Sequence, residues 1–446
     1  MTRTLQEAAF GLAPARWAAA TAFMARGSLS LARGRLYRAL DDLGWVVRVA
    51  DAGPISAAAR ARVFETVGAL RRGPRNAVVD AYLADPASAA CANLFSIWGS
   101  GPHDLFRDLI VLKAATAGEK GVILLKYVRT FDAVIAMFDL RRLMERYVFV
   151  LEPCWAGYCD PSLLMWIHPG QPVFVQCFTD EDYAFIRDIG EPLVPLRLGP
   201  ADWVDAELFQ PRADPSKPYD LVMVANWGRH KRHDVLFEAL RRIRDRRIRV
   251  LLIGFPWANR TAEEIRREAA LIGNDQVEVA VIEKLPANEV AEHVSRCKAF
   301  VFLSRKEGDN KALVEAMFAD VPSIVYDRTV GGARSRINPA TGILSSDEQL
   351  ADRICYMLDH HAEFTPRAWA LDHTGSAVAT RVLDTAIRDV VTRGGGAYTR
   401  SIVEKTNSPN LTYKDPTDRA AFAAEYQFIL SCRRTPGAEA RRPAVA

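Results

Sequence analysis

Two carboxylates frame a short polar turn in the second half of the chain. Glu307 stands at the start of the turn, and Glu315 follows eight positions later among apolar residues. The turn separates an apolar run from a helical pattern, so we expect it to open a helix at the end of a strand. A helix start offers free backbone N–H groups and a positive dipole end to an anion. The pattern therefore predicts a phosphate-binding turn.

The apolar surroundings of Glu315 call for a partner. Leu313, Val314 and Ala316 flank it, so its charge is expected to be partly desolvated. Lys311, one helical turn earlier, is one candidate partner. A sugar hydroxyl is the other, and the residues alone leave both open.

The hydrophobic pattern also predicts the elements that position this turn. Residues 299–303 are expected to form a buried strand, residues 311–318 a helix and residues 321–326 a second strand. These three elements make a βαβ unit. Open parallel sheets bind ligands at the carboxyl ends of their strands, which is where the turn would lie.

The run Glu307-Gly308-Asp309-Asn310-Lys311-Ala312-Leu313-Val314-Glu315, followed by Asp320-Val321-Pro322, resembles the Glu-x7-Glu segment of retaining glycosyltransferases of family 4, which have the GT-B fold. The resemblance implies that Glu307 faces the donor sugar, that Gly308, Asp309 and Asn310 meet the diphosphate, and that Glu315 holds the ribose. The usual Gly-Phe-Gly or Gly-Leu-Pro core is here Gly-Asp-Asn, so the identity of the donor sugar is left open.

A basic turn follows the apolar run at residues 221–225. Gly228, Arg229, Lys231 and Asp234 align with the Gly-Arg…Lys segment of the same family. Cations at the carboxyl end of a strand can stabilise charge on a departing diphosphate. A solvated basic turn is the alternative, and the Glu-x7-Glu unit in the same expected sheet favours the phosphate role.

A third loop contains Gly331 and Gly332, where the family often has Gly-Gly-x-Pro-Glu. The Pro-Glu pair is absent, and Arg334 and Arg336 stand nearby. Either arginine could receive a carboxylate or phosphate of a substrate, since a guanidinium fork suits both. A salt bridge to an acid of the same domain is the alternative. The expected catalytic residues are Glu307, Arg229 and Lys231, and the expected donor-binding residues are Gly228, Gly308, Asp309, Asn310, Lys311, Glu315, Gly331, Gly332 and Arg334.

The acceptor side is less defined. The family commonly carries a His after a strand that corresponds here to residues 147–151, but this chain has Glu152-Pro153-Cys154-Trp155. Glu152 and His103 are the two candidate replacements, and either could be structural.

The fold class expected from these patterns is α/β. Alternating strands and helices imply parallel sheets covered on both faces, and the resemblance implies a GT-B protein with two Rossmann-like doubly wound domains facing across a cleft. The first domain is expected to open with a strand at 20–25, a helix at 36–43 and a strand at 45–49, and to continue with helices at 57–70, 104–117 and 131–146 and strands at 94–98, 122–128, 147–151, 173–178 and 193–198.

The expected domains are residues 1–212 for the acceptor, with extra N-terminal helices, and 213–375 for the nucleotide sugar. C-terminal helices at 376–432 are expected to cross back to the first domain, and 433–446 to be a disordered tail.

Composition bounds the partners. A formal net charge of +4 and the absence of a long basic run argue against nucleic acid. Seven scattered cysteines indicate free thiols in a reducing compartment, and Cys154, Cys159, His168 and Cys177 lack paired metal-ligand spacing, so no metal is expected. The expected location is the cytoplasm, with peripheral contact at the inner face of a membrane as an option, because no stretch reaches transmembrane length.

The function implied is therefore transfer of a sugar from a UDP- or GDP-linked donor to a glycan, lipid-linked or other acceptor, with retention of configuration and no cofactor, in polysaccharide or glycoconjugate biosynthesis. Two other classes stay open. One is a sugar-nucleotide epimerase or hydrolase, which would consume donor without acceptor. The other is a catalytically silent binding module of the same fold.

Overall fold

The structure is a computed structural model that describes residues 13–49, 53–72, 106–154, 161–167, 171–212, 217–257, 259–408 and 410–434. Contacts divide the chain into two compact units, which are described one at a time. The first, called here the 198–381 unit, contains residues 198–381 and 406–410. The second, called the N-terminal unit, contains residues up to 197 together with 382–405 and the chain from 411 onward.

The 198–381 unit is built on a six-stranded parallel sheet with the order β11-β10-β9-β6-β7-β8. The strands are β6 (Tyr219–Val224), β7 (Ile248–Gly254), β8 (Val277–Glu283), β9 (Cys297–Phe302), β10 (Ser323–Tyr326) and β11 (Gly342–Ser345). The strand order reverses between β6 and β9, which is the topological switch point of a doubly wound sheet.

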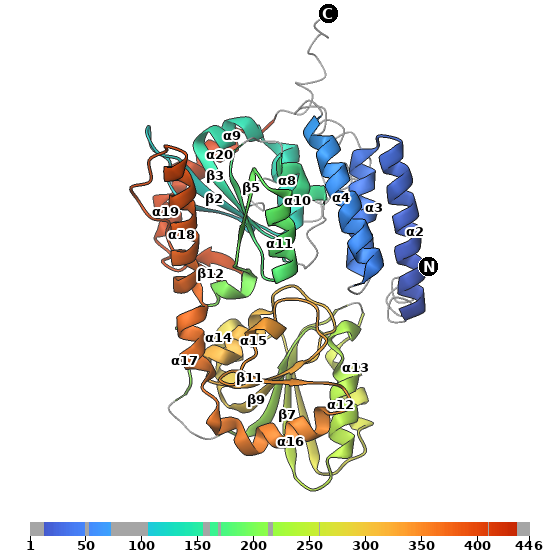
Figure 1. Cartoon of the computed structure of the whole chain (residues 1–446). Helices are drawn as coiled ribbons and strands as arrows, with labels where there is room; N and C mark the ends of the chain where they lie inside the picture. The colour runs from blue at the N-terminus through green and yellow to red at the C-terminus, as the bar shows by residue number, and fades with distance from the viewer. Residues whose placement is uncertain are drawn as a thin grey trace, which may run out of the picture. The chain divides into compact units, whose positions relative to one another are not determined.

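Helices cover both faces of this sheet (Figure 1). They are α12 (His233–Arg242), α13 (Ala262–Ala270), α14 (Ala287–Ser295), α15 (Lys311–Phe318), α16 (Leu350–His360) and α17 (Pro366–His373). Neighbouring strand residues point to opposite faces. Leu221 and Met223 therefore lie in the core under α12, α13 and α16, whereas Val222 lies in the core under α14, α15 and α17.

Residues 198–212 belong to this unit, although the sequence pattern placed them in the first domain. Ala201, Val204 and Phe209 are fully buried and pack in the same core as Val222. Their burial explains why this stretch clusters with the sheet that follows it.

The N-terminal unit has a five-stranded sheet with the order β1-β2-β3-β4-β5. The edge strand β1 runs antiparallel to β2, and the other pairs are parallel. The strands are β1 (Leu109–Lys113), β2 (Gly121–Lys126), β3 (Tyr147–Glu152), β4 (Val173–Gln176) and β5 (Leu193–Leu196). The α/β class and the two Rossmann-like parallel sheets expected from the sequence are confirmed.

Helices α8 (Val128–Met137), α10 (Pro161–Leu164) and α11 (Asp180–Ile189) lie on one side of this sheet, and α9 (Leu140–Arg146) and α20 (Ala423–Ser431) lie on the other (Figure 1). The chain also forms α18 (Ser376–Arg393), β12 (Lys405–Asn407), β13 (Leu411–Tyr413) and α19 (Asp418–Ala421). Glu425 anchors α20, because it accepts hydrogen bonds from Arg146, at 2.9 Å, and from Tyr147. The C-terminal residues thus pack with the N-terminal unit.

The expected opening of the first domain is wrong. Residues 13–72 form three helices, α2 (Ala13–Ala32), α3 (Leu36–Val49) and α4 (Pro54–Arg72), so the strands expected at 20–25 and 45–49 are helical. Alanine has the highest helix propensity and outweighs the short apolar runs there. Phe64 of α4 packs on Phe185 of α11 with ring centroids 5.3 Å apart, which attaches these helices to the unit.

Two other assignments are corrected. The helix expected at 104–117 is replaced by β1, whose residues are all buried and include the β-branched Ile110 and Val111. The helix expected at 131–146 is broken at Phe138, because Asp139 starts a new helix by accepting a hydrogen bond from the amide of Arg142 at 3.1 Å. The strand expected at 94–98 and most of the tail at 433–446 lie outside the described residues.

None of the helices in the described part of the chain is long and apolar enough to cross a membrane.

Asp132 of α8 is a buried acid in the core of the N-terminal unit. The hydroxyl of Ser162 donates to Asp132 Oδ2 at 2.7 Å, and among the described residues Oδ1 has no hydrogen-bond partner. Burial raises the pKa of Asp132 to about 7, only partly opposed by the Ser162 hydrogen bond.

We expect Asp132 to make stability depend on pH. Its pKa is higher in the folded protein than in the unfolded chain, so its contribution is present at low pH and is lost as pH rises from about 4 to about 7. Relative to Asp132→Asn, the wild type should lose up to about 4 kcal/mol of unfolding free energy over this range, at about 1.4 kcal/mol per pKa unit. Thermal unfolding across this pH range measures the difference.

The matched control is Asp188→Asn, because Asp188 is half exposed and pairs with Arg187 on the surface of α11. It should show no comparable trend. Parallel pH profiles for wild type and Asp132→Asn would contradict the assignment.

Candidate functional site

The turn between β9 and α15 lies at the carboxyl edge of the parallel sheet in the 198–381 unit. Asn310 caps α15, because its side-chain Oδ1 accepts a hydrogen bond from the amide of Leu313 at 2.9 Å. Asn310 Nδ2 also donates to Glu307 Oε2 at 2.7 Å, and the hydroxyl of Ser304 donates to Glu307 Oε1 at 3.1 Å. Glu307 is thus held in one orientation at the start of a helix.

The basic turn after β6 meets the same carboxylate. Lys231 ends the short 3-10 helix η3 (Arg229–Lys231), and its ammonium forms an ion pair with Glu307 Oε1. β6 and β9 are neighbours in the sheet, so their carboxyl ends bring the two turns together. Both side chains are about nine-tenths buried, and burial lowers the pKa of Lys231 to about 8.

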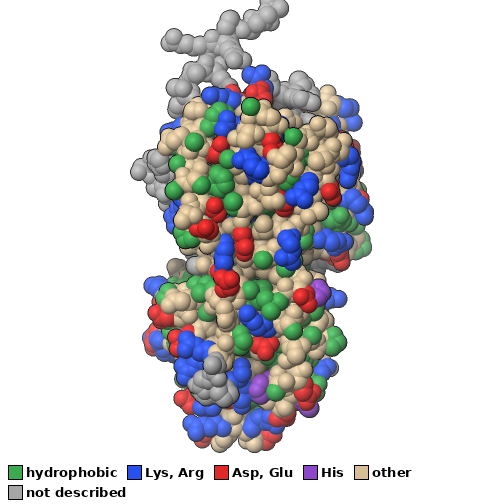
Figure 2. All heavy atoms as spheres, turned by 90° about the vertical axis from the view of Figure 1, so that its left-hand side faces the viewer, with side chains coloured by type: hydrophobic (Ala, Val, Ile, Leu, Met, Phe, Trp, Pro, Cys, Tyr) green, Lys and Arg blue, Asp and Glu red, His purple; other side chains and the backbone are tan. Residues whose placement is uncertain are grey.

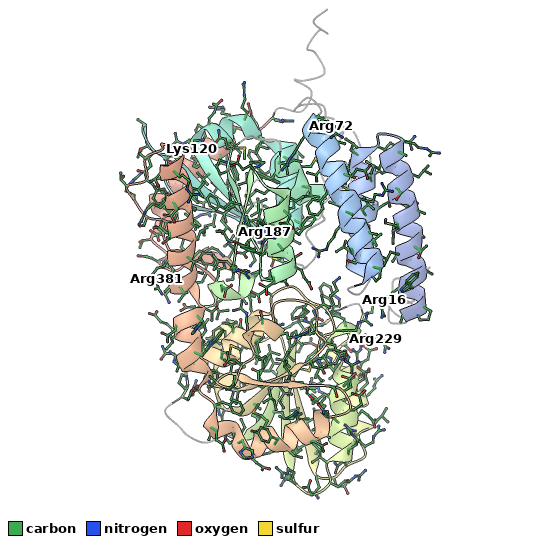
Figure 3. The ribbon with its side chains drawn as sticks, in the orientation of Figure 1. Arg16, Arg72, Lys120, Arg187, Arg229 and Arg381 are labelled. Carbon is green, nitrogen blue, oxygen red and sulfur yellow. The ribbon has the colours of Figure 1, made fainter. Side chains whose placement is uncertain are left out.

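Arg229 differs from Lys231 in exposure. Its side chain is exposed and makes no hydrogen bond or ion pair with any other residue that the structure describes, and Figure 3 shows it at the margin of the unit. The next residue, His230, is half-buried, and burial together with the charge of Lys231 lowers its pKa to about 4. Arg229 is therefore the cation of this turn that stands ready for an anion.

Glu315 lies in the second turn of α15 and is 9% exposed. Burial raises its pKa, and the charge of Lys311 partly opposes this effect. Lys311 Nζ, however, donates a hydrogen bond to the carbonyl of Asn407 at 2.8 Å. No described residue donates a hydrogen bond to the Glu315 carboxylate, so it retains its capacity to accept one from a ligand hydroxyl.

Asp309 and Arg336 form a buried cluster behind the turn. Arg336 binds Asp309 with two hydrogen bonds, of 3.2 and 2.8 Å, and donates to Asp202 Oδ1 at 2.9 Å. The hydroxyl of Thr374 donates to Asp202 at 2.6 Å, and the amide of Ala201 donates to Asp309 at 3.0 Å. Although burial opposes its charge, the two carboxylates raise the pKa of Arg336 above its usual value.

This cluster changes two expectations. Arg336 pairs with acids of its own unit, so the salt-bridge alternative holds for this residue and the substrate-anion alternative does not. Asp309 points into the protein, so of the turn residues only its backbone is left for a ligand. Arg334 is exposed and has no hydrogen-bond or ion-pair partner among the described residues. Sequence reasoning missed Asp202 and Thr374, which carried no motif of their own.

The Gly331-Gly332 loop packs directly on the turn. The amide of Glu307 donates to the carbonyl of Val330 at 2.9 Å, and the amide of Gly332 donates to the carbonyl of Gly308 at 3.0 Å. Gly331 has a φ of +133°, and a Cβ there would lie 2.3 Å from the carbonyl oxygen of Glu307. Only glycine can hold this close approach.

The acceptor-side candidates are not part of this constellation. Glu152 ends β3 in the N-terminal unit, is fully buried and forms a 2.7 Å ion pair with Lys405. His103 lies outside the described residues. Among the described residues, no cluster of His, Cys, Asp and Glu has the arrangement of a metal site.

Residues 204–365 match the family model described as "Glycosyl transferases group 1". The match covers less than half of the chain, and it contains both turns, Glu315 and the Gly331-Gly332 loop. No curated protein matches the chain.

Several solved structures resemble it at low identity. A sucrose-phosphate synthase from Thermosynechococcus elongatus has 18% identity and a TM-score of 0.48, with coverage of 61% of this chain and 74% of that one. Anabaena HepE in complex with UDP has 13% identity and a TM-score of 0.46, with coverage of 60% and 78%. For S. aureus TarM in complex with UDP and other ligands the values are 14%, 0.43, 55% and 51%, so the chain spans about half the length of TarM.

The Arg336 cluster gives a stability prediction. Replacing Arg336 with Met leaves the carboxylates of Asp309 and Asp202 buried without their cation, which typically costs about 3–5 kcal/mol of unfolding free energy. Chemical denaturation followed by tryptophan fluorescence, which reports Trp203 and Trp227 of this unit, measures the change.

Arg334→Met is the control, because Arg334 stands two residues away and is exposed. Its effect should stay within about 0.5 kcal/mol. Equal stabilities of the two variants would contradict the structural role of Arg336.

Proposed function

We propose that the protein is a retaining GT-B glycosyltransferase of family 4 type that transfers a sugar from a nucleotide-sugar donor. The observation that carries this proposal is the meeting of two turns at one sheet edge. The Lys231–Glu307 ion pair, the uncapped ligand face of the helix start at Asn310 and the exposed Arg229 all lie there. Fixed cations and helix-start amides suit a diphosphate.

The residues divide the donor among them. Arg229, Lys231 and the amides of Gly308 and Asn310 bind the diphosphate and stabilise the charge that develops as it departs. Glu307, fixed by Ser304 and Asn310, orients the donor sugar. The buried Glu315 accepts hydrogen bonds from the ribose hydroxyls.

The turn is already organised before any ligand arrives. The ion pair and the hydrogen bonds to Glu307 fix its carboxylate, and the cluster behind it fixes the backbone of Asp309. Such preorganised groups stabilise a transition state without having to reorient during the reaction. Retention of configuration is tested by NMR of the product, in which the anomeric coupling should match that of the donor; an inverted coupling would contradict it.

The finer assignments rest on the family resemblance. We infer that the donor is linked to UDP or GDP, that no metal or cofactor takes part, and that the acceptor is a glycan or lipid-linked molecule held by the N-terminal unit. A cytoplasmic location and peripheral membrane contact stay predictions. On the face that Figure 2 shows, Lys and Arg side chains are interspersed with Asp and Glu, which supports a small-molecule donor better than nucleic acid.

Calorimetric binding of UDP and GDP tests the donor site. Glu315→Ala removes the proposed ribose acceptor, and Arg229→Ala removes a diphosphate cation. Hydrogen bonds to charged groups contribute about 1.5–3 kcal/mol, so each variant should bind about 10- to 100-fold more weakly.

Glu263→Ala and Arg247→Ala are matched controls, because both side chains are exposed on the surface of the same unit. They should bind the nucleotide like wild type. Folded wild-type protein that binds neither nucleotide, or Glu315→Ala and Arg229→Ala variants that bind unchanged, would overturn the proposed donor site.

A further inference from the structure

A second charged site lies in the N-terminal unit, where β2 passes into α8. Lys126 is the last residue of β2 and pairs in register with Glu152 at the end of β3. Tyr127 turns the chain with a φ of 69°, and α8 begins at Val128 with no side chain capping its first turn. The start of α8 thus lies at the carboxyl edge of a parallel strand, which is the ligand-binding edge of such sheets.

Lys126 is buried without a hydrogen-bond partner. Only 2% of the residue is exposed, and no described residue accepts a hydrogen bond from its ammonium. The ammonium lies 5.1 Å from the ring centroid of Tyr127, the residue that precedes α8, so the amine is beside the helix start. Thr130, in the first turn of α8, is 3% exposed, and its hydroxyl also has no partner among the described residues.

Neighbouring charges do not neutralise this ammonium. The carboxylate of Glu152 pairs with Lys405 at 2.7 Å, and that of Asp108 pairs with Arg129 at 3.2 Å. These described residues thus contribute three cations and two carboxylates. Burial opposes the charge of Lys126, but Glu152 and the other neighbours outweigh it and raise the pKa of Lys126, so the amine stays protonated.

A buried, charged ammonium without a partner is costly unless an anion completes it. The groups at hand are a point cation, a hydroxyl and the free amides of a helix start. This set matches a tetrahedral oxyanion, since phosphate accepts hydrogen bonds in several directions and favours a helix N-terminus.

We propose that the β2–α8 junction binds a phosphate group, and that this phosphate belongs to the acceptor. The second half of this statement rests on the glycosyltransferase function proposed above; the phosphate site itself does not. Glu152, buried between Lys405 and Lys126, then serves to position the two ammonium groups rather than to act as a base.

Calorimetric titration with inorganic phosphate, glucose 6-phosphate and glucose tests the site. Wild type should bind both phosphates and not glucose, and Lys126→Met should bind both at least 10-fold more weakly. Lys126→Arg keeps a cation and should recover part of the affinity. The UDP or GDP affinity of Lys126→Met should equal that of wild type, because the nucleotide site is in the other unit.

Lys120→Met is the matched control. Lys120 precedes the opposite end of β2, and its ammonium already donates to the carbonyl of Met144 at 2.6 Å (Figure 3). This variant should bind phosphate like wild type. Thermal unfolding of all variants shows that each is folded.

Each outcome decides one part of the proposal. Equal phosphate binding by wild type and Lys126→Met, or no phosphate binding by folded wild type, overturns the site. Glucose 6-phosphate that binds no more tightly than inorganic phosphate indicates a free-phosphate site and overturns the acceptor assignment. Phosphate binding that depends on Lys126 in a protein that binds no nucleotide supports the site and contradicts only the glycosyltransferase function.

Discussion

The candidate site depends on the buried guanidinium of Arg336. It holds Asp309 with two hydrogen bonds and Asp202 with a third, so that three chain segments meet behind the turn that precedes α15. A buried cation between two carboxylates tolerates little displacement, because any gap leaves a charge unpaired. The backbone of Asp309 and of its neighbours Gly308 and Asn310 is therefore fixed before any ligand binds.

The chemistry of the turn follows from this constraint. With Asp309 directed inward, the turn presents backbone amides rather than a carboxylate, and an anion is not repelled. Glu307 contributes the one nearby carboxylate, and Lys231 neutralises it in an ion pair. The exposed Arg229 and the buried Glu315 then provide a cation and a hydrogen-bond acceptor on either side of the turn. This order of charges suits a nucleotide diphosphate, with its anionic centre and its hydroxyl-bearing ends.

Much of the 198–381 unit was predictable because its strands and helices follow strong local patterns. The βαβ unit around Glu307 and the pairing of its turn with the basic turn at Lys231 both follow from hydrophobic runs that end in polar turns. Residues 13–72 were misread because short apolar runs in alanine-rich sequence fit strand and helix equally, and helix propensity decided. The strand β1 was missed because an antiparallel edge strand breaks the βα rhythm of the rest of the sheet.

Side-chain partners were harder to predict than elements. Arg334 and Arg336 are alike in the sequence, but one is exposed and the other is buried between two acids, one of them more than a hundred residues away. Glu152 was a candidate base by its place after a strand, yet Lys405, which occupies its carboxylate, comes from the far end of the chain. Such pairings depend on tertiary contacts that local pattern does not carry.

The most direct test of the central claim is a crystal structure of the protein with bound UDP, or with GDP if that is the nucleotide that binds. The account predicts that the diphosphate contacts the amides of Gly308 and Asn310 together with Arg229 and Lys231, and that the ribose hydroxyls donate to Glu315. A nucleotide bound elsewhere, or one whose diphosphate points away from the turn before α15, would contradict it.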